Sequence, residues 1–173
     1  MKIKALLKSG KLGYYRFSPS ISRTIFNRWN MNKTSDFIEF DRVLNKGLSL
    51  LKDDKKFRIG FYIIFSVNTG LRISDVLNIK HKDLQDYVLI IREKKTQKQR
   101  EISLNQVVQD SYAKLITKLK EQGIRYDQDD FVFVSQKGSV YRTQSINQVL
   151  KSIFKEKRFQ ISSHSLRKSF ARR

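Results

Sequence analysis

The spacing of apolar residues along the chain predicts a domain built mainly from helices. Between residues 36 and 53, apolar side chains recur at every third or fourth position, which is the period of an amphipathic helix. Ser35 stands where the N-cap of this helix is expected, and acidic residues follow in its predicted first turn. Residues 56–68 are apolar on nearly every face. This second helix is therefore predicted to lie at the centre of the core and to end at Gly70.

The rest of the chain alternates short strands with helices. Residues 87–92 and 101–104 are predicted to pair as a β-hairpin, with the charged segment EKKTQKQR at its tip. The other expected elements are a short helix over 74–77 capped by Ser74, a helix over 106–121 capped by Asn105, a strand over 130–134, a helix over 143–157 and a last helix capped by Ser162 or Ser163. The predicted fold class is therefore α+β, mainly α with a small antiparallel β-sheet.

Residues 1–35 differ in composition from the rest of the chain. They carry eight Lys or Arg and no Asp or Glu, and they contain Pro19, the single proline. This composition predicts a basic, mostly extended arm or linker, with a short strand or turn around residues 14–17. Two interpretations stay open, an arm that follows a nucleic-acid backbone and a solvated tail without a partner. The compact domain is expected to span residues 36–173.

The overall composition narrows the classes of function. The 173 residues carry 36 Lys and Arg against 16 Asp and Glu, and this net charge of +20 indicates a polyanionic partner such as a nucleic acid. The absence of cysteine excludes a thiolate zinc site, and two histidines are too few for a three-histidine metal centre. We therefore expect no metal and no small-molecule cofactor. The longest apolar stretch, residues 59–67, is about half of the roughly 20 residues that a membrane span needs. We accordingly expect no membrane partner and a cytoplasmic location.

Three separated segments place basic residues in settings that suit phosphate chemistry. The first, TGLRISDVL, holds Arg72 and Asp75 just after the predicted core helix. The second is the hairpin tip, with Lys94, Lys95, Lys98 and Arg100. The third, HSLRKSFA, places His164 and Arg167 on one face at the start of the last helix, where free amides and the helix dipole favour a phosphate. Taken singly, each segment has a plain structural explanation: an Arg72–Asp75 ion pair, a solvated loop, or a structural histidine beside an arginine.

Together and in this order, the three segments resemble the boxes of the tyrosine recombinases, the phage-integrase family. TGLRISDVL resembles the first-arginine box of the family, KKTQKQREISL its lysine hairpin and HSLRKSFA its HxxR box. The resemblance covers about residues 35–173 and implies the DNA breaking-and-rejoining catalytic fold of that family. It also implies duplex DNA as the partner, with other recombinase protomers on the DNA as an open possibility.

The resemblance assigns a role to each matched residue. It implies that Arg72 and Arg167 grip the non-bridging oxygens of the scissile phosphate and that Asp75 orients the arginine site. It implies that His164 shares in proton transfer or hydrogen-bonds the phosphate. Planar guanidinium groups stabilise the charge of a phosphodiester in transfer without a metal. The 16 acids are scattered, which argues against the converging carboxylates of a two-metal nuclease.

The hairpin tip contains the implied general acid. The resemblance assigns this role to Lys95, which would protonate the leaving 5′ oxygen, and Lys94 and Lys98 stay open as alternatives because they are close in sequence. The cations expected to contact DNA around the reacting phosphate are Lys94, Lys98, Arg100 and Lys168.

The chemistry of the family requires a nucleophilic tyrosine beyond the HxxR box. All seven tyrosines of this sequence precede His164, so no nucleophile is assigned. We therefore expect a catalytic domain incomplete at its C-terminus, which binds duplex DNA but does not form a covalent phosphotyrosine. Three alternatives stay open: a non-catalytic DNA-binding or regulatory module of the same fold, a type IB topoisomerase and a basic RNA-binding protein.

Overall fold

The computed structural model describes residues 5–6, 12–13, 35–155 and 160–173. The chain divides into two compact units, Met1–Thr34 and Ser35–Arg173. In the first unit, strands β1 (Ala5–Leu6) and β2 (Leu12–Gly13) pair antiparallel. The other predictions for the basic arm, including the turn around residues 14–17, lie outside the described residues.

The second unit is mainly helical with one small antiparallel sheet, so the predicted fold class is confirmed. In chain order its elements are α2 (Phe40–Leu51), α3 (Phe57–Thr69), α4 (Ile73–Val76), the 3-10 helix η1 (His81–Leu84), β3 (Val88–Arg92), β4 (Gln99–Ser103), α5 (Gln106–Glu121), α6 (Thr143–Phe154) and α7 (Ser163–Ala171). The hairpin register runs from Val88 opposite Ser103 to Arg92 opposite Gln99. Within the described ranges, no helix is both long enough and apolar enough to cross a bilayer.

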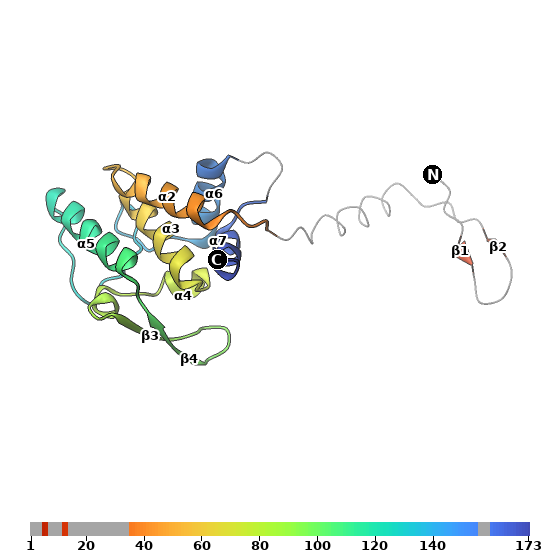
Figure 1. Ribbon diagram of the computed structural model, residues 1–173, viewed down its shortest axis with the longest axis horizontal. Coiled ribbons are helices and arrows are strands. Elements are labelled where there is room, and N and C mark those ends of the chain that lie inside the picture. The colour runs from red at the N-terminus through yellow and green to blue at the C-terminus, as the bar shows by residue number, and fades with distance from the viewer. Residues whose placement is uncertain (1–4, 7–11, 14–34, 156–159) are drawn as a thin grey trace. The chain divides into compact units, whose positions relative to one another are not determined.

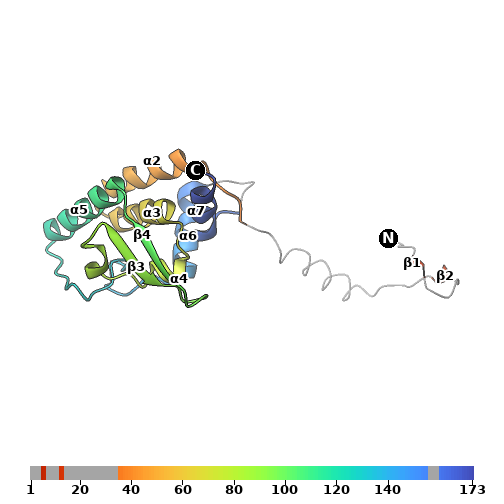
Figure 2. The ribbon, with the colours of Figure 1, turned by 60° about the horizontal axis from the view of Figure 1, so that its bottom comes forward.

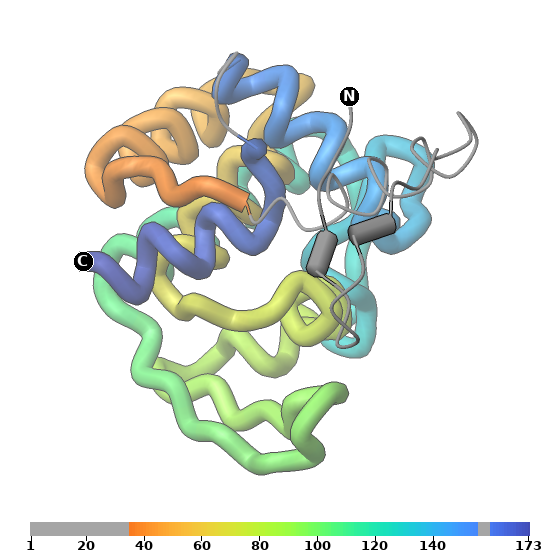
Figure 3. Tube along the Cα trace, turned by 90° about the vertical axis from the view of Figure 1, so that its right-hand side faces the viewer, coloured from red at the N-terminus to blue at the C-terminus, as the bar shows by residue number. Residues whose placement is uncertain are grey.

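Helix α3 is the centre of the core. Every residue of α3 except Asn68 is buried, which accounts for a sequence that is apolar on nearly all faces. Helix α2 crosses it at close range: a Cβ on Gly60 would lie 2.4 Å from the backbone nitrogen of Leu51, so the crossing requires glycine. Figures 1, 2 and 3 agree that α2 lies on one side of α3 and the β3–β4 hairpin on the other.

Aromatic rings join α3 to the chain that follows the hairpin. Phe133 stacks on Phe61 with ring centroids 5.6 Å apart and meets Tyr62 edge-on at 5.7 Å. Phe61 also lies 5.9 Å from the ring of Tyr112 in α5. Such ring pairs stabilise a core beyond the apolar area that they bury. They hold α5 and the loop around Phe133 against the core helix.

The segment before α2 is extended, which corrects the prediction of a helix starting near residue 36. Helix α2 begins at Phe40 with Glu39 as its N-cap, so Ser35 does not cap it. Asp36 instead binds the chain ahead of α7: its N–H donates to the Gln160 carbonyl at 3.0 Å, and the Gln160 N–H donates to Asp36 Oδ2 at 2.7 Å. These long-range bonds hold the segment extended, although the spacing of its apolar residues is that of a helix.

Two smaller predictions are also wrong. Residues 130–134 form no strand, because their backbone makes only two isolated bridges, Lys80 with Phe131 and Val134 with Val140. Helix α4 begins one residue early, with Arg72 as its N-cap, and the Ser74 hydroxyl donates to Asp75 Oδ1 at 3.3 Å. In both places, contacts with side chains and loops determine the local structure, and the spacing of apolar residues does not.

The other helix limits follow local chemistry. Helix α5 has its predicted bounds, and the Asn105 side chain accepts a hydrogen bond from the Val108 N–H at 3.0 Å, so this N-cap is confirmed. Helix α6 ends at Phe154, earlier than predicted, because Lys155 adopts the left-handed region at φ 35°. Residues 156–159, where the helix was expected to finish, lie outside the described residues.

Candidate active site

Arg72 follows directly on the end of the core helix. The Thr69 hydroxyl donates to the Phe65 carbonyl at 2.9 Å, and Gly70 closes α3 in the left-handed region at φ 61°, as predicted. Leu71 is buried, and Arg72 is extended at φ −70° and ψ 147°. This turn leads the Arg72 side chain out of the core, where it is 31% exposed.

Helix α7 packs against this same turn. A Cβ on Gly70 would lie 2.2 Å from Cδ1 of Phe170, so the ring fills the space that any side chain would need. The Ser169 hydroxyl ties α7 to the chain before α2: it accepts from the Ile38 N–H at 3.2 Å and is also hydrogen bonded to the Ile38 carbonyl. Figure 3 shows α7 in dark blue, with orange α2 on one side and the green hairpin on the other. The last part of α7 is thereby held against the end of α3 and the chain before α2.

His164 and Arg167 lie on the first turn of α7. Of the two predicted caps, Ser162 is the N-cap, and its hydroxyl accepts from the His164 N–H at 3.2 Å. His164 is exposed and Arg167 is half-buried. Arg167 Nη1 is buried and has no hydrogen-bond partner. A buried cationic donor without an acceptor is costly, so this nitrogen is suited to receive an anion.

One cleft brings the three predicted segments together. It has a volume of about 480 Å³ and is lined by Arg72, Lys95, His164 and Arg167, with Leu71, Ile73, Ser74 and Ser163 beside them. The contact between Gly70 and Phe170 sets the two arginines on the same cleft, and the hairpin tip contributes the lysine. The four side chains that the family resemblance named as catalytic are therefore neighbours in space.

Glu93, which the sequence analysis does not single out, is buried at the base of the hairpin tip. Three donors surround its carboxylate: Thr96 Oγ1 donates to Oε2 at 2.7 Å, Arg100 Nη1 to Oε1 at 2.9 Å and Arg72 Nη1 to Oε2 at 2.5 Å. The Thr96 hydroxyl and the Arg100 guanidinium, followed by Arg72, hold the pKa of Glu93 down at about 2. The carboxylate is therefore ionised at neutral pH despite its burial.

Asp75 is buried and supports the hairpin tip. Its Oδ1 accepts from the Lys94 N–H at 3.0 Å, while its Oδ2 is buried with no hydrogen-bond partner. Arg72 pairs with Glu93, so an Arg72–Asp75 ion pair does not explain the TGLRISDVL segment. The role proposed for Asp75 is to orient the site. The bond that would do so is the one from the backbone N–H of Lys94, the residue before Lys95.

The cations expected to contact DNA divide into two kinds. Lys94 and Lys98 are exposed on the hairpin tip. Arg100 forms an ion pair with the buried Glu93, and Lys168 Nζ donates to the Ser35 carbonyl at 2.5 Å. The last two therefore also stabilise the fold, whatever they contribute at a DNA surface.

One signal in the sequence could have pointed to Glu93. It is the single acid in the tip segment EKKTQKQR, next to four cations. An isolated acid in a strongly basic loop is a natural partner for a nearby arginine. No local pattern shows, however, that this partner is Arg72, because the two residues belong to different elements.

The electrostatics of the cleft act on His164 as well. Burial, and after it the charges of Lys168 and Arg167, lower the pKa of the His164 imidazole from its ordinary value of 6.5. The ring is therefore neutral at neutral pH and can donate or accept a hydrogen bond at the mouth of the cleft.

The comparison with protein families agrees with this geometry. The model described as "Phage integrase family" matches residues 42–173, which include every residue that lines the cleft. The chain belongs to the phage integrase family. The family predicted from the three segments is thus confirmed. Among curated proteins, no relative matches the chain.

Solved structures show the same fold as this phage integrase domain. The XerA recombinase matches with a TM-score of 0.60 and 20% identity, over 78% of this chain and 48% of the other. The Tn1549 transposon integrase in complex with transposon right end DNA matches with a TM-score of 0.62 and 17% identity, over 80% and 53%. The XerH site-specific recombinase bound to palindromic difH substrate matches with a TM-score of 0.60 and 24% identity, over 81% and 42%. The chain spans about half of the length of these recombinases.

None of the described tyrosines lines the cleft of this phage integrase domain. Tyr62 is buried in α3, and Tyr87 is exposed beside β3. The remaining described tyrosines are half-buried, Tyr112, Tyr126 and Tyr141. Tyr14 and Tyr15 lie outside the described residues.

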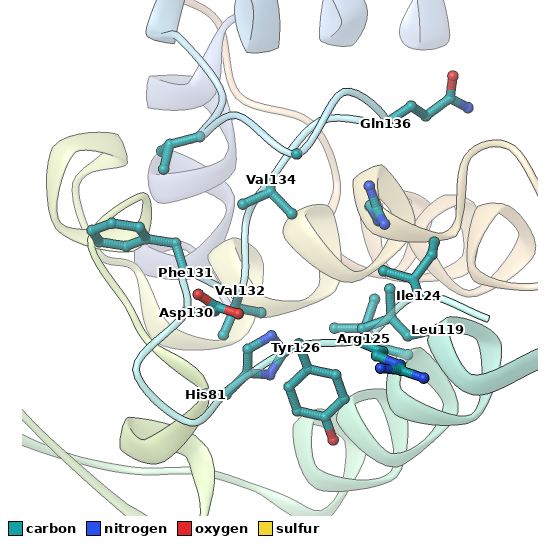
Figure 4. Close-up of a pocket in the computed structure, with 14 residues that line it drawn as sticks. His81, Leu119, Ile124, Arg125, Tyr126, Asp130, Phe131, Val132, Val134 and Gln136 are labelled. Carbon is teal, nitrogen blue, oxygen red and sulfur yellow. The ribbon is translucent and has the colours of Figure 1, made fainter. Parts of the chain in front are cut away.

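A second cavity, of about 260 Å³, lies between α5 and residues 124–140 (Figure 4). The His81 ring lies 4.2 Å from the Tyr126 ring, and His81 Nδ1 is hydrogen bonded to the Tyr112 hydroxyl at 2.9 Å. Burial lowers the pKa of His81. With these contacts, His81 is a neutral histidine whose ring is hydrogen bonded and packed in the core. In the part of the chain that the structure describes, no three His, Cys, Asp or Glu side chains converge as metal ligands.

Proposed function

We propose that the domain binds duplex DNA and holds one phosphodiester in the cleft between Arg72 and Arg167, as the catalytic domain of a site-specific tyrosine recombinase or integrase. The observation that carries the proposal is the convergence of four basic side chains from three separate segments on one cleft. One of them, Arg167, has a buried guanidinium nitrogen without a partner. Such preorganised donors stabilise the charge that develops on a phosphoryl group in transfer.

Each cleft residue has a part in the proposed reaction. Arg72 and Arg167 hold the non-bridging oxygens of the scissile phosphate. In such a recombinase a tyrosine hydroxyl gives up its proton to a base in the site and its oxygen attacks the phosphorus, so that a 3′-phosphotyrosine bond forms and the bond to the 5′ oxygen breaks. Lys95 gives its proton to that leaving oxygen, and His164 hydrogen-bonds the phosphate or shares the proton transfer. The reverse sequence rejoins the strand.

Similar proteins support duplex DNA as the partner. The Tn1549 transposon integrase is in complex with transposon DNA, and the XerH recombinase is bound to its difH substrate. Both share this fold. By extension, we propose that this chain acts on DNA in the cytoplasm, alone or beside other recombinase protomers on the same duplex.

We further propose that the 173-residue polypeptide binds DNA without cleaving it. The support is that no described tyrosine lines the cleft. A nicked suicide duplex, which traps a covalent intermediate by losing the 5′ end, tests this directly. Denaturing gels are expected to show no covalent protein–DNA adduct. An adduct whose tryptic peptide carries a modified tyrosine would contradict the proposal.

The second candidate is a non-catalytic DNA-binding or regulatory module of the same fold, and the same tyrosine positions favour it. A chain extended to supply a tyrosine separates the two candidates. The recombinase proposal expects cleavage that Arg72→Ala abolishes while DNA binding remains, and the regulatory module expects no cleavage at all. Stronger binding of structured RNA than of duplex DNA at matched salt would favour a basic RNA-binding protein instead.

A further inference from the structure

Glu93 is a buried carboxylate at the base of the hairpin tip, and it binds three side chains at once. It is 5% exposed and accepts hydrogen bonds from Thr96, Arg100 and Arg72. A buried charge of this kind is stable only when its partners stay in place. The carboxylate and its three donors are therefore expected to move as one group.

The bond to Glu93 fixes the position of Arg72 but leaves most of its N–H donors available. The bond to Glu93 Oε2 uses Nη1 alone, at 2.5 Å, and a guanidinium has five N–H donors in a fixed plane. The Arg72 side chain lines the cleft and is 31% exposed. Fixing one edge of the plane leaves the other donors directed and free to bind a phosphate, at a smaller entropic cost than a mobile arginine would incur.

The same carboxylate constrains the turn that carries Lys95. Thr96, the next residue, donates its hydroxyl to Glu93, and the Gln97 N–H donates to the Glu93 carbonyl at 2.8 Å. Gln97 adopts φ 57°, a conformation that needs support in a residue other than glycine. Without Glu93, the tip loses its side-chain link to Arg72, and only the bond from the Lys94 N–H to Asp75 still joins the tip to the Arg72 segment.

We propose that Glu93 is a positioning residue that joins Arg72 and the Lys95 turn into one phosphate-binding unit. The inference rests on the proposed function, because it concerns the site that holds the DNA phosphate. It assigns to Glu93 a role that none of the three sequence boxes contains. Glu93 does not touch the reacting atoms and acts through Arg72 and Thr96.

A double-mutant cycle on DNA affinity tests the proposal. The four proteins are the wild type, Arg72→Ala, Glu93→Gln and the double variant, with affinity for one duplex measured by fluorescence anisotropy at fixed salt. In the wild-type background, Arg72→Ala is expected to weaken binding about tenfold, the effect of one charge-assisted contact. In the Glu93→Gln background, the same change is expected to weaken binding less than about twofold, because the arginine is already misplaced.

Glu101→Gln is the matched control. Glu101 is an exposed acid on β4 of the same hairpin, and its substitution removes the same charge. If net charge alone mattered, both substitutions would tighten binding to a polyanion. The proposal expects opposite signs: Glu93→Gln weakens binding about threefold or more, and Glu101→Gln tightens it or leaves it within about twofold.

The results of these experiments distinguish the role of Glu93 from the proposed DNA-binding function. Failure of the wild-type protein to bind duplex DNA would overturn the proposed function. Equal losses from Arg72→Ala in both backgrounds, or tighter binding by Glu93→Gln, would overturn the role of Glu93 alone. If circular dichroism shows that Glu93→Gln does not fold, Thr96→Val takes its place, since Thr96 is exposed and its hydroxyl is the group lost. Thr96→Val is then expected to weaken binding about twofold to threefold and to reduce the effect of Arg72→Ala, and no such coupling would contradict the proposal.

Discussion

At the scale of single residues, the cleft holds more positive charge than its own acids neutralise. Glu93 is shared between two guanidinium groups, Arg167 Nη1 has no partner, and Lys95 is exposed. Such a site is unfavourable when empty and favourable when a phosphate enters it. The charges also set the protonation of His164, which gives the site a pH dependence.

DNA affinity is predicted to rise as the pH falls from about 7.5 to 5.5, because of His164. Burial and the neighbouring cations keep its pKa below 6.5 in the free protein. A bound phosphate raises that pKa, so the complex holds more protons than the free protein and acid strengthens binding. Anisotropy titrations across this range measure the effect.

His164→Gln serves as the control for this pH dependence. The only other histidine, His81, is buried and hydrogen bonded to Tyr112. The substitution is therefore expected to make the affinity nearly independent of pH over the same range. A pH dependence that persists in His164→Gln would contradict the assignment of this residue to the phosphate site.

Glu93 gives a second pH prediction, on stability. Its pKa is about 2 in the folded protein against an ordinary value of 4.5, so its contribution to stability is fully present above pH 4.5 and is lost as the pH falls toward 2. At pH 6, Glu93→Gln is expected to lower the free energy of unfolding by about 1–3 kcal/mol. The difference from wild type should shrink by pH 3 in urea titrations, whereas a constant difference would show that the charge of Glu93 is not involved.

At the scale of elements, the site depends on how α7 meets the end of α3. Gly70 both reverses the chain at φ 61° and lies under the ring of Phe170. The hairpin tip is joined to the same place by two bonds: the Lys94 N–H donates to Asp75, and Arg72 donates to Glu93. Two contacts between elements thus assemble a cleft that no single element contains.

Gly70→Ala is predicted to lower the free energy of unfolding by about 2–5 kcal/mol, from backbone strain together with the clash against Phe170. Gly123→Ala is the matched control, because Gly123 has a similar φ of 66° with nothing near its missing Cβ. That variant is expected to lose only about 1–2 kcal/mol, the cost of the backbone conformation alone. Equal losses in urea unfolding would show that the contact with Phe170 does not matter.

The elements also show where sequence reasoning succeeds and where it stops. Helices α3 and α5 were predictable because their limits are local: an apolar run ended by Gly70, and an Asn105 cap. The start of α2 was not, since Asp36 is held extended by Gln160, far away in the chain. The same holds in the site. Arg72, Lys95, His164 and Arg167 were recognisable from their boxes, but the partner of Arg72 was not, because Glu93 belongs to another element.

At the scale of the whole molecule, the charge of +20 acts on every phosphate near the surface. Observed DNA affinity is predicted to fall linearly on a log–log plot against salt, with a slope of about −0.9 for each phosphate neutralised. Removing Arg72 and Arg167 together is expected to make this slope shallower by about 1, the share of one phosphate. An unchanged slope would place these arginines away from the DNA.

We propose that DNA phosphate binds chiefly in the cleft and is not held by the overall charge alone. The most direct test compares the double variant Arg72→Ala/Arg167→Ala with Arg125→Ala/Arg142→Ala, which removes the same charge from exposed positions outside the cleft. At one salt concentration, anisotropy is expected to show a loss of about 30-fold or more for the cleft variant and about threefold or less for the control. Equal losses for the two variants would contradict the claim.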